Sequence, residues 1–161
     1  MAKKSTKNMK KPQGIWWLCF ILYIGIMVWL LFFRSQVWTA GLSYQQMLQE
    51  NINLKPLFTI RNYINVILHY PDSYYYEHCI INLIGNILLF IPAGFLPPRL
   101  IPSLKKFFCF LPTVLICLLF VELLQLFALV GSFDVDDIIL NLFGILIGYL
   151  VFLCSAKNKN L

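Results

Sequence analysis

Seven polar side chains that interrupt apolar stretches of this sequence have the types and spacing to do chemistry together. They are carboxylic acids and carboxamides in three groups: Asn82 and Asn86, then Glu122 and Gln125, then Asp134, Asp137 and Asn141. Neighbouring carboxylates can serve as general acid and general base, and with amide oxygens they can hold a divalent cation. Since polar groups are costly inside a membrane, such a set indicates a functional site.

The spacing within each group puts its members on one face of a helix. The intervals are three, four and seven residues, which match the helical repeat. At 1.5 Å per residue the groups cover similar depths, from the surface to roughly 12 Å below it. Inward-pointing faces can satisfy one another, so the sequence predicts a polar pocket that opens toward the outside. Asp136 lies off this face and is expected to point toward the membrane interface.

We expect Glu122 and Asp137 to be the acid and base of this pocket, and the other residues of the set to bind a ligand. The alternative is that the whole set only joins helices, since amides bridge transmembrane helices for about 0.6–2 kcal/mol each. Two carboxylates, however, repel each other unless one is protonated or a cation lies between them. A divalent cation with His78 as a further ligand is another alternative. No metal-ligand spacing favours it, and we expect no cofactor.

The composition is that of an integral membrane protein. Of the 161 residues, 60% are apolar and 12% are charged, and the mean hydropathy is +0.74. Soluble domains are about 45–50% apolar and about 25% charged. The net charge of +6 reflects basic residues placed as cytoplasmic loops require, so we expect no nucleic-acid partner. The five cysteines show no disulfide or zinc spacing.

Four apolar stretches are long enough to span a bilayer, which takes about 20 residues. They cover residues 15–33, 78–96, 107–130 and 135–154, and the last three form a predicted three-helix core at 78–154. The sequence therefore predicts an all-α integral membrane protein with four transmembrane helices.

The segment between the first two spans, residues 34–77, is the one long polar stretch. It is expected to hold a short surface helix near 45–50 and a second helix near 60–68 with one apolar face. The second helix is too short to span, so we expect an interfacial or re-entrant segment at the outer leaflet. Basic tails at 1–14 and 155–161 complete the chain.

The basic residues predict the orientation. With the N-terminus in the cytoplasm, the inner segments carry five, three and two Lys or Arg, and the much longer outer segment carries three. All seven acidic residues then lie outside or within the membrane. Both distributions predict cytoplasmic N- and C-termini.

Glycine and proline predict how two of the spans are shaped. Gly144 and Gly148 form a small-xxx-small face that lets another helix approach closely. Pro92 and Gly94 are expected to kink or end the second span near its inner side.

The run N-x-x-x-N-I-L-L-F-I-P-A-G-F-L-P, followed by E-L-L-Q and then by D-V-D-D-I-I-L-N-L-F-G-I-L-I-G-Y, resembles the VanZ-like family of bacterial membrane proteins. The resemblance covers about residues 51–152 and departs at Ser132-Phe133, where many members look to have a basic residue or threonine. It implies a multi-pass protein of the bacterial plasma membrane. The founding member is associated with low-level resistance to the lipoglycopeptide teicoplanin, so the resemblance implies a role in glycopeptide resistance or in handling envelope lipids or cell-wall precursors.

The sequence is compatible with several functions. The pocket could bind a lipid-linked or lipoglycopeptide ligand among membrane lipids, or Glu122 and Asp137 could make an intramembrane enzyme acting on a lipid or lipid-linked precursor. Glu122 could also be the proton site of a small transporter, although four spans without an internal repeat argue against a monomeric one. The chain could also be a purely structural partner. The sequence does not fix the oligomeric state.

Overall fold

Four long apolar helices form the body of the molecule. The computed structural model describes residues 13–33, 41 and 43–157, so most of the tail at 1–14 and the last residues of the C-terminal tail lie outside it. The helices long and apolar enough to cross a membrane are α1 (Gln13–Phe32), α4 (Tyr76–Leu100), α5 (Phe107–Phe127) and α6 (Val135–Lys157). The prediction of an all-α membrane protein with four candidate spans is therefore confirmed.

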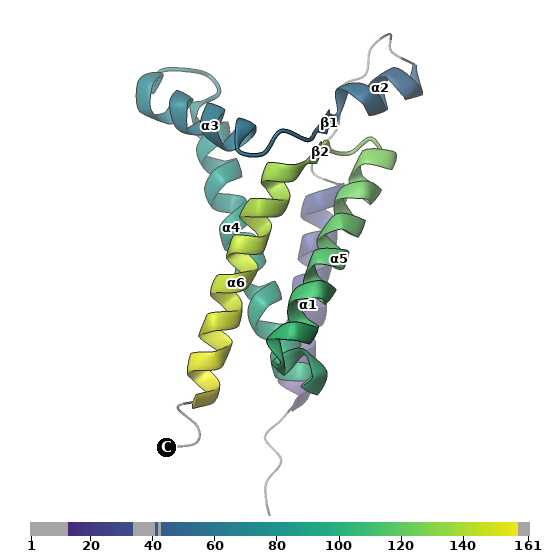
Figure 1. The fold of residues 1–161 in the computed structure, drawn as a ribbon, viewed down its shortest axis with the longest axis vertical. Coiled ribbons are helices and arrows are strands. Elements are labelled where there is room, and N and C mark those ends of the chain that lie inside the picture. Colours follow the sequence, from purple (N-terminus) through teal and green to yellow (C-terminus); the bar gives the residue numbers. More distant parts are fainter. Residues whose placement is uncertain (1–12, 34–40, 42, 158–161) are drawn as a thin grey trace, which may run out of the picture.

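Four of the shorter elements gather at one end of the bundle, which we call the loop end (Figure 1). They are α2 (Tyr44–Glu50), β1 (Ile52–Asn53), α3 (Phe58–His69) and β2 (Phe133–Asp134). The two short strands pair in parallel and join the long loop to the turn between α5 and α6. The last turn of α6 lies at the opposite end of the bundle. The short helices predicted in the long polar stretch are thus α2 and α3.

The second span is longer than predicted. α4 passes through Pro92 and ends at Leu100 rather than near 96. An unpaired backbone group in a bilayer costs several kcal/mol, so a helix that meets a proline there tends to continue. The 3-10 helix η1 (Pro102–Lys105) then connects α4 to α5. The third span ends at Phe127, a turn earlier than expected.

Glycines bring α4 and α6 into close contact. A Cβ atom added to Gly144 would lie 2.1 Å from the carbonyl oxygen of Ile87, and one added to Gly148 would lie 1.9 Å from that of Ile91. No side chain fits at these distances, so the backbones approach as small residues allow in membrane helices. The close approach predicted for the two glycines is present, and it sets the register of the helices that carry the site.

The end of the bundle opposite the loop end is held by aromatic contacts. The rings of Phe110 and Tyr149 stack with centroids 4.4 Å apart, and the Tyr149 hydroxyl donates a 2.9 Å hydrogen bond to the carbonyl of Lys105. The guanidinium of Arg99 lies 3.9 Å from the ring centroid of Trp16, which attaches α1 to α4. Aromatic packing thus dominates this end of the bundle, whereas the polar set lies toward the loop end.

Candidate functional site

A cavity of about 660 Å³ lies between the four long helices, toward the loop end. Its walls come from α1, the first half of α4, the end of α5, the α5–α6 turn and the start of α6. Six residues of the predicted polar set line it: Asn82, Asn86, Glu122, Gln125, Asp137 and Asn141. The structure therefore brings three helices of the predicted core to one cavity.

The contact between Asn86 and Asp137 joins α4 to α6 across the cavity. The Nδ2 atom of Asn86 donates a 2.7 Å hydrogen bond to Oδ1 of Asp137. This contact depends on the glycine-mediated approach of the two helices two turns further along α6 at Gly144. A short hydrogen bond from an amide to a carboxylate orients the acid and satisfies one of its oxygens.

Glu122 and Asn141 are the most buried polar lining residues, and each is 4% exposed. The Oε2 atom of Glu122 and the Oδ1 atom of Asn141 are buried and have no hydrogen-bond partner among the described residues. Because a buried acceptor without a donor costs about 1–3 kcal/mol, the two free oxygens are the strongest sign that this cavity receives another group.

Gln125 and Asn82 also line the cavity, but their hydrogen bonds serve the protein itself. The Nε2 atom of Gln125 donates a 3.0 Å bond to the carbonyl of Leu31, which ties α5 to α1. The Nδ2 atom of Asn82 donates a 3.0 Å bond to the carbonyl of His78, one turn earlier on the same helix. Interhelical joining accounts for Gln125, whereas the contacts of Asn82 are local.

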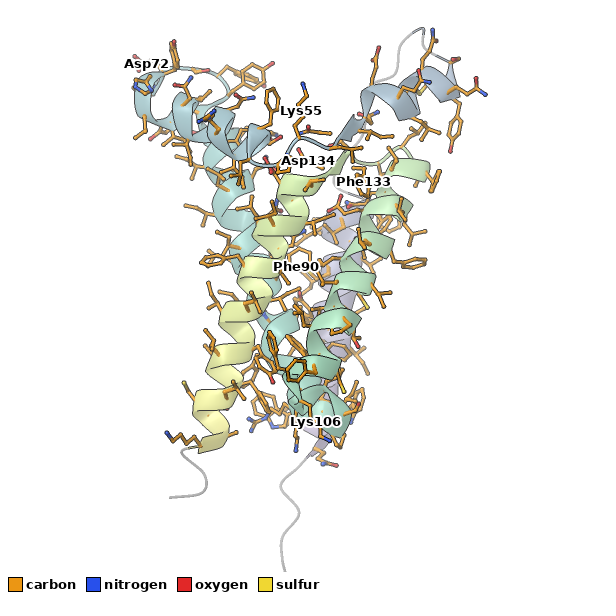
Figure 2. The ribbon with its side chains drawn as sticks, in the orientation of Figure 1. Lys55, Asp72, Phe90, Lys106, Phe133 and Asp134 are labelled. Carbon is orange, nitrogen blue, oxygen red and sulfur yellow. The ribbon has the colours of Figure 1, made fainter. Side chains whose placement is uncertain are left out.

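Asp134 is not among the residues that line the cavity, contrary to expectation. It belongs to β2, and α6 begins one residue later. Its Oδ2 atom accepts hydrogen bonds from the hydroxyl of Thr59 at 2.6 Å and from the amide of Asn53 at 3.2 Å. Figure 2 shows it beside Phe133, where the short strands meet α6. Helical spacing does not apply to Asp134, because this residue precedes the first residue of α6.

Asp136 was expected to point toward the interface, and this prediction is wrong. Its side chain is 0% exposed. Its carboxylate accepts backbone hydrogen bonds from Leu57 at 2.5 Å and from Ile60 at 3.0 Å. These amides lie at the first turn of α3, where helix N–H groups lack partners and favour a negative charge. Since Leu57 offers no side-chain cap, Asp136 caps α3 from another part of the chain.

Several residues around the cavity were not predicted to belong to it. Leu30 and Leu31 of α1 line one side, and Tyr74 and Tyr75 lie at the loop end. No spacing pattern links α1 to the polar set, so only the tertiary structure reveals that α1 lines the cavity. The two tyrosines lie in the polar stretch 34–77, and no helical spacing connects them to the polar set.

Tyr63 of α3 lies near the site, with its ring centroid 6.1 Å from that of His78. Burial raises the pKa of the Tyr63 phenol to about 12, and the negative charge of Asp137 adds to the shift. The phenol is therefore neutral at physiological pH.

The cavity offers few side chains that could bind a metal ion. Across residues 13–33, 41 and 43–157, no group of three or more His, Cys, Asp and Glu side chains is arranged to hold a metal ion. A cation in the cavity would have to combine the carboxyl groups of Glu122 and Asp137 with the amide oxygens of Asn86 and Asn141. Such oxygen ligands suit hard cations.

Comparison with known proteins agrees with the resemblance seen in the sequence. A model of the VanZ/LLP1 family matches residues 20–156, most of the 161-residue chain, and the match includes all the described residues that line the cavity. Comparisons with curated proteins and with solved structures give no significant match. The four candidate spans, the residues of the polar set and the extent of the match lead to one conclusion: the chain belongs to the VanZ/LLP1 family.

Proposed function

We propose that this protein binds the polar head of a lipid-like or lipid-linked ligand in the cavity, within the bacterial plasma membrane. We further propose that this binding alters sensitivity to the lipoglycopeptide teicoplanin. The loop end would face outward and both termini the cytoplasm, because that orientation follows the distribution of basic residues.

The observation that carries the proposal is the Glu122 carboxyl group. It is 4% exposed, it lines the cavity, and one of its oxygens has no partner among the described residues. Acidic side chains at membrane depth mark ligand and ion sites more often than structural ones. A role limited to joining helices would leave this oxygen unsatisfied, whereas a bound polar head could satisfy it.

The cavity lining also has both a polar and an apolar side, as the binding of an amphiphile requires. Its polar side includes Asn86 and Asp137, and its apolar side includes Leu30, Ile81 and Leu89. Pockets for small ligands combine apolar walls with a few convergent polar groups. An acyl chain could lie along the apolar wall while its head reaches the carboxyl groups.

The test compares Glu122→Gln and Asp137→Asn with the parent chain in a bacterial host that lacks its own copy. The minimum inhibitory concentration of teicoplanin is measured at matched membrane expression. Both variants keep the side-chain volume and remove the charge, so we expect tolerance to fall to the level of the host without the protein. Asp72→Asn is the matched control, because Asp72 is exposed and does not line the cavity.

Two results would count against the proposal. Full tolerance in both well-expressed cavity variants would mean that the carboxyl groups are not needed. An unchanged tolerance with the parent chain itself would remove the link to teicoplanin.

A second candidate function is favoured by the presence of Asp137 in the same cavity as Glu122. Paired carboxyl groups can transfer protons as acid and base, so the protein could be an intramembrane enzyme acting on a lipid or lipid-linked precursor. The lipid profile of cells with the parent chain is compared with that of Asp137→Asn cells. A lipid that accumulates only in the variant, and its missing product, would favour the enzyme over the binding protein.

A further inference from the structure

We propose that the ligand head group carries a protonated primary amine, which the cavity holds between Glu122 and Asn141. This inference rests on the proposed function and narrows it from an amphiphile of any head group to one class. The amine could belong to a membrane lipid or to an amphiphile that enters the membrane from outside.

The charges of the lining favour a cation. The eighteen lining residues that the structure describes include three carboxylic acids, Glu77, Glu122 and Asp137, one histidine, and no lysine or arginine. Among these described residues a phosphate head would be buried beside like charges without a basic partner, which is strongly unfavourable at low dielectric. Phosphate sites in proteins are built from Arg, Lys or backbone N–H groups, so these lining side chains disfavour a head group whose only charge is negative.

The free polar atoms favour a hydrogen-bond donor. The two buried oxygens without partners, Oε2 of Glu122 and Oδ1 of Asn141, are both acceptors. An ammonium group offers three N–H donors and no acceptor, so it complements a lining whose buried unpartnered atoms are acceptors. The charge of the ammonium group also neutralises a carboxylate, which otherwise would be buried uncompensated.

The loop end of the cavity offers a path suited to the same group. The rings of Tyr74 and Tyr75 form an edge-to-face pair with centroids 5.6 Å apart, and Glu77 follows in the first turn of α4. Aromatic faces attract ammonium groups, and a carboxylate beside them adds to the attraction. From Glu77 to Leu89 the lining covers roughly 18 Å of α4, which is room for a head group and part of a chain.

A metal ion is less well matched to the same atoms. The described residues contain no three-residue cluster of His, Cys, Asp and Glu arranged for a metal. One oxygen of Asp137 is already engaged by Asn86, which reduces what remains for coordination.

The test uses native mass spectrometry of the full chain with four single-chain probes of equal length. Dodecylamine carries the amine, dodecyltrimethylammonium keeps the charge without N–H donors, dodecanol is neutral and dodecyl phosphate is anionic. We expect dodecylamine to bind most tightly. Glu122→Gln should weaken it about 10-fold, the usual effect of losing one charge-assisted hydrogen bond. Asp137→Asn provides a second variant, and Asp72→Asn provides the control.

The outcomes separate this inference from the proposed function. If dodecanol or dodecyl phosphate binds best and Glu122→Gln weakens that binding, the cavity binds an amphiphile. The inference that the head group is an amine is then wrong. If dodecylamine binds equally to Glu122→Gln, Asp137→Asn and the control, the amine inference is overturned. If no probe binds and the cavity variants keep full teicoplanin tolerance, the proposed function fails as well. Competition by phosphatidylethanolamine but not phosphatidylglycerol would assign the amine to a membrane lipid, and its absence would assign it to another amphiphile.

Discussion

Asn86 and Asp137 lie 51 residues apart in the sequence and are joined by a 2.7 Å hydrogen bond across the interface of α4 and α6. The bond fixes the position of Asp137, one of the three acids that line the cavity, relative to the second span. It forms where glycines have brought the helix backbones together. The geometry of the site and the packing of the bundle therefore depend on the same helix pair.

Removing the donor of this bond should cost stability. Asn86→Ala leaves the partly buried Asp137 carboxylate without its amide, and the expected loss in unfolding free energy is about 1–3 kcal/mol. Unfolding in a mixed detergent series measures it. Asn82→Ala is the matched control because Asn82 bonds within its own helix. Equal losses for the two alanine variants would mean that the interhelical bond adds nothing.

The glycine contact should tolerate no side chain. In Gly148→Ala the new Cβ would lie 1.9 Å from the carbonyl oxygen of Ile91, so α4 and α6 must separate. We expect a loss of about 1–3 kcal/mol, as for overpacked cores, together with loss of teicoplanin tolerance. In Gly25→Ala the added Cβ meets nothing within 4 Å, and it should have no effect on either measurement. A stable Gly148→Ala protein would contradict the packing described here.

The cap supplied by Asp136 should protect the start of α3. Asp136→Asn removes the charge and one of the two oxygens that accept from Leu57 and Ile60. Hydrogen–deuterium exchange at these two amides should become about 10- to 100-fold faster, corresponding to a hydrogen bond to a charged group. The amides of α5 serve as internal reference. Unchanged exchange at both positions would show that α3 is held by other contacts.

The proposed orientation can be tested by cysteine labelling. In a chain whose five native cysteines are replaced, Asp72→Cys and Lys105→Cys place single thiols at exposed positions near opposite ends of α4. A membrane-impermeant maleimide applied to intact cells should label position 72 and leave position 105 unlabelled until the cells are lysed. The reverse pattern would place the cavity toward the cytoplasm and rule out an outward-facing site.

Much of the fold follows from local features of the sequence. Apolar stretches of about 20 residues identify membrane spans regardless of their neighbours, so the four spans were predicted with small errors at their ends. The second span does not end at Pro92, because a helix in a bilayer cannot end without leaving backbone groups unpaired.

The residues that line the cavity were predicted only where they share one continuous helix. Helical spacing placed Asn86, Glu122, Asp137 and Asn141 at similar depths, and all four line the cavity. It misplaced Asp134 and Asp136, because their partners Thr59 and Leu57 lie at the start of α3, far away in the sequence. A periodic pattern contains no information about such a partner.

The sequence by itself thus determined four membrane helices and a set of polar residues at similar depth on three of them, since hydropathy and helical repeat are local properties. Only the tertiary structure decided which acids face the cavity and which hold the loop. It also added α1 as a wall through Leu30 and Leu31. These outcomes depend on backbone contacts such as that between Gly144 and Ile87, which form only when distant segments pack together.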